Sequence, residues 1–436
     1  MGSGSRIGQR ISRASRDQMI WDMMCLDDLL SADHRARQVW AYVEGCDLSA
    51  LYEKIRAVEG GAGRAPIDPA ILMALWLYAT LEGVGSARLL ERLCESDAAY
   101  RWICGGVGVN HHTLCDFRVG AGGVLDDLLT RSMAALAQAR IVDLSCLGVD
   151  GVRVRASAGA SSFRSQSRLS QLHDLAQRKV AALKGELSVD PAASSQRAAA
   201  RKLREAEERR QRIAAAQKAA AAIDAERAKE AVKQRRRKLK KSKPPRGSTT
   251  DAQARVMAMA DGGYRAAYNL QFKTELKEGF VVGIDVTNKA SDSGQLDAAS
   301  EEIERRYGVR PERLLADGGY ANKEDIEAQH NKGIAVFCPP PRWKGKLVAA
   351  QSVPAKPKLK RKEKPGVELW HERMGSEESA AIYAQRITCE RPHADVRNRG
   401  LYRFLVRGME KVKAVALWHI IAYNFLQIQR LTPQAA

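Results

Sequence analysis

The pattern of apolar and polar residues predicts a helical first part of the chain, residues 1–145, with breaks at glycine and proline. Asp68 and Pro69 form a typical helix start, and an apolar run follows at helical spacing until Gly83. The polar group at 110–113 predicts the start of another short helix. Short helices with tight turns are compatible with helix-turn-helix DNA binding, and equally with a generic helical bundle.

The pattern then changes to that of a strand and a pair of long helices. Over 146–160, Val152, Val154 and Ala156 alternate with Arg153 and Arg155, which predicts a half-buried strand. Within 161–250, leucine and alanine recur at helical intervals, and the chain then becomes rich in Ala, Arg, Lys and Glu as far as the basic run 234–241. We expect an inserted basic helical hairpin, whose charged face is either simply solvated or in contact with a DNA backbone.

Residues 251–436 alternate between strand and helix patterns. Strands are expected over 266–272, 280–286, 313–316 and 334–338, and helices over 295–307, 323–331, 377–391 and 401–431. The Lys- and Pro-rich stretch 344–366 predicts a mobile loop. This order predicts an α/β domain that the hairpin interrupts after its first strand.

The composition limits which classes of binding partner are expected. The formal net charge of +20 favours a polyanion, which could be DNA, RNA or an anionic membrane surface. The eight cysteines contain no C-x-x-C pair, so we expect free, buried thiols in a reducing compartment and no zinc site. We find no signal-peptide pattern and no apolar run long enough to span a bilayer, and therefore expect a soluble cytoplasmic protein with no membrane partner.

Three carboxylates stand where strand or helix ends could bring them together: Asp150, Asp317 and Glu390. Oxygen ligands of this kind suit a pair of Mg²⁺ ions, which could activate an attacking oxygen and stabilise a leaving one at a phosphodiester. Each acid also has an ordinary interpretation, since Asp-Gly pairs often form turns and helix glutamates are often solvated. Other acids compete for the role, and composition and spacing do not choose among them: Asp143, Asp285, Asp292, Glu377 and Glu378.

A resemblance to a known protein family indicates which of these acids form the site. The stretch from Tyr383 through Arg386 to Glu390 resembles the Y-x2-R-x3-E signature of bacterial insertion-sequence DDE transposases. In that family a lysine follows the glutamate after six more residues, where this chain has Arg397. The strand around Asp150-Gly151 and the sequence Asp317-Gly318-Gly319-Tyr320 are similar to the family's first and second acidic motifs. Weaker similarity covers 66–118, 268–271 and 407–424.

The resemblance implies a ribonuclease-H-like α/β catalytic core with an all-α N-terminal domain that binds the terminal inverted repeats. It assigns catalysis and metal binding to Asp150, Asp317 and Glu390, with two Mg²⁺ ions for which Mn²⁺ can substitute. It assigns DNA contacts to Tyr383, Arg386 and Arg397, and it implies double-stranded DNA and a homodimer in the synaptic complex. Three alternatives stay open: a nuclease without strand transfer, an inactive or repurposed DNA-binding relative, and an RNA-binding protein.

Overall fold

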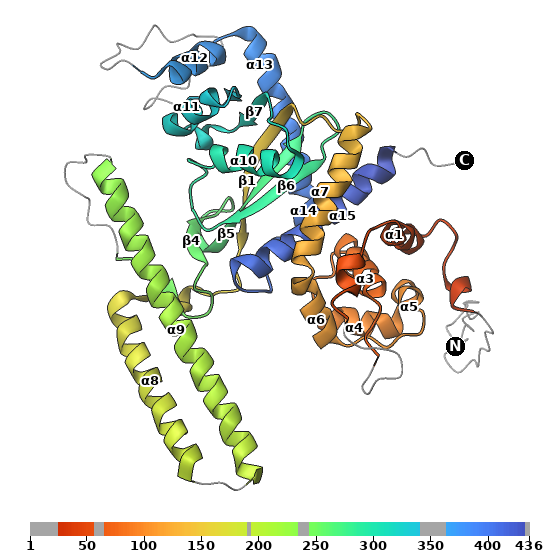
Figure 1. Cartoon of the computed structure of the whole chain (residues 1–436), viewed down its shortest axis with the longest axis vertical. Coiled ribbons are helices and arrows are strands. Elements are labelled where there is room, and N and C mark those ends of the chain that lie inside the picture. Colours follow the sequence, from red (N-terminus) through yellow and green to blue (C-terminus); the bar gives the residue numbers. More distant parts are fainter. Residues whose placement is uncertain (1–24, 56–64, 190–192, 234–243, 341–362, 432–436) are drawn as a thin grey trace, which may run out of the picture.

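The computed structural model describes residues 25–55, 65–189, 193–233, 244–340 and 363–431. A mixed sheet forms its centre, the N-terminal helices lie to one side, and a long helical hairpin projects from another (Figure 1). The basic run 234–241 and most of the Lys- and Pro-rich stretch 344–366 lie outside the described residues. In the part of the chain that is described, no helix has both the length and the apolar character needed to cross a membrane.

The described residues before the sheet are helical. Asp68 and Asn110 each accept a backbone N–H at a helix start, as their positions in the sequence predict. The helix after Asp68 is buried on every side, because other helices surround it. The helices are α1 (Arg35–Glu44), α2 (Ser49–Tyr52), α3 (Pro69–Leu81), α4 (Ala87–Ser96), α5 (Ala98–Cys104), α6 (His111–Gly120) and α7 (Gly122–Gln138), with the short 3₁₀ helix η1 (Leu26–Leu29) before them.

The main sheet has six strands in the order β4-β5-β1-β7-β8, with β6 also paired to β5. Strand β5 is antiparallel to β1, β4 and β6, whereas β1, β7 and β8 are parallel. This curled mixed sheet flanked by helices is compatible with a ribonuclease-H-like core. The strands are β1 (Cys146–Arg155), β4 (Arg255–Ala258), β5 (Tyr264–Glu275), β6 (Val281–Thr287), β7 (Arg313–Ala316) and β8 (Ala335–Phe337).

The segment between β1 and β4 consists of two long helices and a small ribbon. Helices α8 (Gln166–Val189) and α9 (Ala193–Lys233) pack against each other through a thin apolar seam that includes Leu169, Ile213 and Ala216. Strands β2 (Phe163–Ser165) and β3 (Arg246–Ser248) pair where the two helices leave the sheet. The short 3₁₀ helix η2 (Ala160–Ser162) precedes them.

Several sequence-based boundaries need correction, among them the predicted loop 344–366, whose last two residues belong to the unexpected helix α12 (Pro365–Met374). Strand β4 was not expected, because it is only four residues long and carries a weak apolar pattern. The helix predicted over 377–391 is three pieces, α13 (Glu377–Ala384), the 3₁₀ helix η4 (Gln385–Cys389) and α14 (Glu390–Asn398). The last helix, α15 (Met409–Leu431), begins eight residues later than expected, after Gly408 with a positive φ. The remaining elements are α10 (Leu296–Tyr307), the 3₁₀ helix η3 (Gly318–Tyr320), α11 (Lys323–Asn331) and α12 (Pro365–Met374).

The eight cysteines are all free, as expected, but they are not all buried. Cys104, Cys338 and Cys389 are buried, whereas Cys25 and Cys115 are exposed. The expectation of uniformly buried thiols was therefore wrong.

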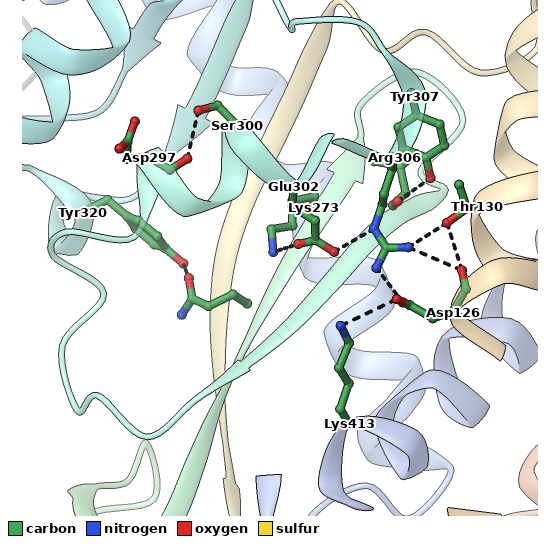
Figure 2. A network of polar contacts seen from close by, with 12 residues as sticks. Asp126, Thr130, Lys273, Asp297, Ser300, Glu302, Arg306, Tyr307, Tyr320 and Lys413 are labelled. Atoms are coloured by element: carbon green, nitrogen blue, oxygen red, sulfur yellow. Dashed lines mark hydrogen bonds and ion pairs between the residues drawn. The ribbon is translucent and has the colours of Figure 1, made fainter. Parts of the chain in front are cut away.

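A buried network of charges joins the N-terminal helices to the sheet (Figure 2). Glu302 on α10 accepts from Lys273 of β5 and, at 2.8 Å, from Nε of Arg306. The other end of the Arg306 guanidinium reaches Asp126 of α7 at 2.5 Å. Since these side chains come from three separate elements, the network fixes α7 and α10 against the strand.

Candidate active site

Asp150 lies in the middle of β1 rather than in a turn. It faces Phe272 of β5 in the antiparallel register, and only 7% of its surface is exposed. Its own strand neighbour Gly151 donates a backbone N–H to its Oδ1 at 2.8 Å. A carboxylate in the centre of a sheet needs a partner of opposite charge or a proton.

Asp317 is brought beside Asp150 by the parallel pairing of β1 and β7. Val149 is in register with Ala316, so the two acids are the next residues on neighbouring strands. Asp317 begins η3, and its side chain accepts the backbone N–H of Gly319 at 2.8 Å. The turn expected at 317–319 therefore exists, and it places this carboxylate at the end of the strand.

Arg386 and Glu390 reach Asp150 from a late segment of the chain, made of η4 and α14. Gly148 of β1 allows η4 to pack directly on the strand, because a side chain there would collide with the sulfur of Cys389. Arg386 of η4 donates to Oδ2 of Asp150 at 3.0 Å, and its other nitrogen lies 3.9 Å from Glu390. Glu390 is the first residue of α14, and 64% of its side chain is exposed.

The charges around Asp150 affect its ionisation. Burial raises the pKa of Asp150 to about 6, the charges of Asp317 and Glu390 add to this rise, and Arg386 opposes it. His393 of α14 has Nδ1 3.8 Å from the same carboxylate, and burial lowers the pKa of this imidazole to about 3. The histidine is therefore neutral near pH 7, and Arg386 is the counter-charge that Asp150 contacts.

The donor chemistry suits a hard divalent cation, although the carboxylates are not yet gathered around one point. In the described residues, no three His, Cys, Asp or Glu side chains lie close enough together to hold a metal ion. Arg386 lies within 3.0 Å of Asp150 and 3.9 Å of Glu390. Carboxylate oxygens are the ligands that Mg²⁺ prefers, so the residue types fit such an ion.

The remaining predicted DNA-contact residues surround this cluster. Tyr383 is half-buried and packs in a small apolar cluster with Leu315 and Cys389. Arg397 is exposed near the end of α14, close enough to His393 to help lower its pKa. Among the described residues, Nε of Arg386 is buried and makes no hydrogen bond, and 18% of this side chain is exposed.

Sequence reasoning missed a polar network on the opposite face of the sheet. Asp292 accepts from Asn269 at 2.6 Å and from Gln271 at 2.9 Å, and Gln271 accepts from the hydroxyl of Tyr320 at 2.6 Å. The sequence offered a signal, because Asn269 and Gln271 sit in the Tyr-Asn-Leu-Gln strand and Asp292 was one of the competing acids. A side chain at Gly151 would lie 2.5 Å from an Asp292 oxygen, so this loop packs directly against the strand that carries Asp150.

Comparisons with known proteins point to transposases. The family model described as Transposase DDE domain matches residues 240–425, and the one described as Transposase domain (DUF772) matches residues 24–119. Asp317 and Glu390 lie inside the first match, whereas Asp150 lies between the two. No curated protein and no solved structure matched the chain. The two matches support a transposase function and a DNA substrate.

Proposed function

We propose that this chain is the transposase of a bacterial insertion sequence, which cuts DNA strands at the ends of the element and joins them to target DNA. The part of the chain before the sheet binds the terminal inverted repeats, and the α/β part carries the chemistry. The two transposase family matches and the acids on β1, directly after β7 and on α14 support this proposal.

The observation that supports it most strongly is that Asp150, in the buried centre of β1, has one of the three acids on the neighbouring strand end and shares the contact of Arg386 with the other. Asp150 and Asp317 follow paired residues of two parallel strands, and Arg386 lies 3.0 Å from Asp150 and 3.9 Å from Glu390. The electrostatic influence of Asp317 and Glu390 on Asp150 supports their being close. A structural role alone does not explain three acids with one cationic contact, because unbalanced like charges destabilise a folded protein.

Each residue then has a distinct role. Asp150, Asp317 and Glu390 supply the carboxylate oxygens that would hold two Mg²⁺ ions, or Mn²⁺ in their place. When bound, such ions activate an attacking oxygen and stabilise the leaving one during displacement at phosphorus. We assign a contact with a phosphate oxygen to the guanidinium of Arg386, whose side chain is 18% exposed. We also assign DNA contacts to Tyr383, which packs beside Cys389, and to Arg397, which is exposed on α14.

We further propose that the protein acts in the cytoplasm as a homodimer when it holds both ends of the element. Strand transfer joins two ends to one target, so one complex has to hold both ends at once. The net charge of +20 supports the binding of several DNA segments, because each phosphate contact releases counterions.

The test measures cleavage and strand transfer with Mg²⁺ on a plasmid that carries the element's ends. Asp150→Asn, Asp317→Asn and Glu390→Gln should each reduce both reactions by about 10²- to 10³-fold or more, the scale of removing a group that stabilises developing charge. Asp285→Asn is the matched control, since Asp285 is an exposed acid on β6. It should leave both reactions unchanged.

The outcomes separate the alternatives. Full activity in any of the three variants removes that residue from the site. Cleavage without joined products would instead indicate a nuclease. Tight DNA binding with no Mg²⁺-dependent cutting in the unmodified protein would indicate a non-catalytic relative.

A further inference from the structure

A large groove separates the helical hairpin from the sheet. It has a volume of about 1820 Å³, and its walls come from α9, β3, β4, the start of β5 and the loop after β6. Its lining includes Ser293 and Asn322, and Asn322 follows Asp317 by five residues. None of the proposed catalytic residues lines it.

The groove is strongly cationic. Eight of its lining residues are Arg or Lys, whereas Glu226 is the one acid among the described lining residues. These cations come from elements that are far apart in the sequence, including Arg155 on β1, Lys289 after β6 and Arg403 before α15. A random basic surface does not require such convergence, but a site for a polyanion does.

Only part of this charge is balanced by acids. Arg255 pairs with Glu226 at 2.7 Å, and Arg155 pairs with Asp261 at 2.9 Å. Arg246, Lys289 and Arg403 are exposed and belong to no ion pair in the described part of the chain. Their mutual repulsion would be relieved by a ligand that carries several negative charges.

The groove also offers apolar surface. Tyr264 has 77% of its surface exposed at the start of β5, and Val256 on the paired strand has 47% exposed. A free phosphate ion gains nothing from these side chains, whereas the sugars and bases of a nucleic acid can pack on them. This combination favours a polynucleotide over a small anion.

The groove lies at a useful distance from the acid cluster. Arg155 is five residues beyond Asp150 on the same strand, or roughly 17 Å at 3.3 Å per residue. Successive phosphates of one DNA strand are about 3.4 Å apart along the helix axis, so this spacing corresponds to about five nucleotides.

We propose that this groove, between α9 and the sheet, binds the phosphate backbone of DNA that flanks the cut site. The inserted hairpin is then one wall of a DNA-binding site rather than a solvated appendage. The identification of the polyanion as DNA rests on the proposed transposase function. The inference that the groove binds a polyanion rests on its lining residues alone.

The first experiment maps lysine protection on the unmodified full-length protein. The probe is a random-sequence duplex of about 30 base pairs, roughly 100 Å long, without divalent metal. Bound duplex should slow acetylation of Lys289 and Lys229, which line the groove. Lys179 and Lys202 are the internal controls, because they are exposed on the same hairpin and do not line the groove. Lys202 lies about 30 Å along α9 from the groove at 1.5 Å per residue.

The second experiment removes charge. The variant Arg246→Ala/Lys289→Ala/Arg403→Ala should bind the duplex about tenfold or more weakly, and the slope of log affinity against log salt should fall by about 2.7, at roughly 0.9 per contact. The matched control Arg178→Ala/Lys179→Ala/Lys202→Ala removes the same charge from exposed hairpin positions outside the groove. It should change the affinity and the slope much less.

Equal effects of the two variants, together with equal protection of all four lysines, would overturn the proposal. Stronger protection by structured RNA than by duplex DNA would also overturn it. Failure of the proposed transposase function would give a different result. Duplex DNA would still protect Lys289 from acetylation, but the Asp150→Asn variant and the unmodified protein would cut DNA equally.

Discussion

The two faces of strands β1 and β5 carry polar clusters of opposite character. On one face, Lys273 pairs with Glu302, which also accepts from Arg306, and Arg306 pairs with Asp126 (Figure 2). On the other face, Asp150 and Glu390 share a contact with Arg386, and Asp317 adds a further negative charge near Asp150. Asp150 pairs with Phe272 of β5, so these two side chains lie on the same face of the sheet. Lys273 is the next residue of β5, and because side chains alternate along a strand it points to the opposite face.

The difference between the clusters indicates their roles. In the first, every charge has a partner of opposite sign, so the cluster stabilises the attachment of α7 and α10. In the second, acids outnumber the cation, a guanidinium donor has no hydrogen bond among the described residues, and Glu390 faces solvent. A balanced network serves stability, whereas an unbalanced one is typical of a site that receives a charged ligand.

The largest expected effect on stability comes from removing the negative charge of Glu302 from the balanced cluster. Glu302→Gln should lower the free energy of unfolding by about 3–5 kcal/mol, because it leaves Lys273 and Arg306 buried with too little negative charge. Asp150→Asn, the same chemical change in the unbalanced cluster, should alter it by less than about 1 kcal/mol. Urea titration measures both.

Glu301→Gln is the control for this comparison, because Glu301 is an exposed neighbour of Glu302 on α10. It should change stability by no more than about 0.5 kcal/mol. Similar losses at positions 302 and 150 would contradict the assignment of one cluster to stability and the other to function.

A smaller effect should follow from placing a side chain between the sheet and the Asp292 loop. In Gly151→Ala the new Cβ would lie 2.5 Å from an Asp292 oxygen and 2.9 Å from Nε2 of Gln271. We expect a loss of about 1–3 kcal/mol, as for an overpacked core, together with slower strand cleavage because Asp150 is adjacent. Thermal unfolding and the cleavage assay test this, with Gly159→Ala as control, since its new Cβ would meet only a serine oxygen at 3.7 Å.

The effect that is smallest near neutral pH, and that grows only in acid, is a pH dependence of stability from His419 on α15. Burial lowers the pKa of this imidazole to about 3, so the folded protein keeps it neutral while the unfolded chain takes up a proton below about 6.5. Its contribution to stability is complete above pH 6.5 and is lost as the pH falls toward 3, by up to about 1.4 kcal/mol per pH unit. His419→Leu should remove this slope.

For this last prediction, the free energy of unfolding of the His419→Leu variant is compared with that of the unmodified protein at each pH, because other groups titrate in the same pH range. Glu302, for example, would have its pKa raised by burial alone, but Lys273 and Arg306 lower it to about 2, so it also destabilises the fold as the pH falls. Parallel pH profiles for the His419→Leu variant and the unmodified protein would show that the histidine is not buried in neutral form.

Particular elements show how far the sequence could predict the fold. The helix predicted over 323–331 has those bounds in α11, because Asn322 caps it and its residues favour a helix. The helix predicted over 377–391 breaks at η4, because that segment packs directly on β1 at Gly148, a contact with no signal in local sequence. Local capping and periodicity are encoded along the chain, whereas contacts between distant segments are not.

For the candidate site, the sequence determined which residue types were available and, through its resemblance to transposase motifs, which three acids to propose. It also determined the excess of positive charge that calls for a polyanion. Only the tertiary structure decided that Asp150 and Asp317 follow paired residues of two strands, and that Arg386 contacts both Asp150 and Glu390. The same is true of the basic groove between α9 and the sheet. The physical reason is that strand register and packing between segments more than a hundred residues apart depend on burying the whole core at once.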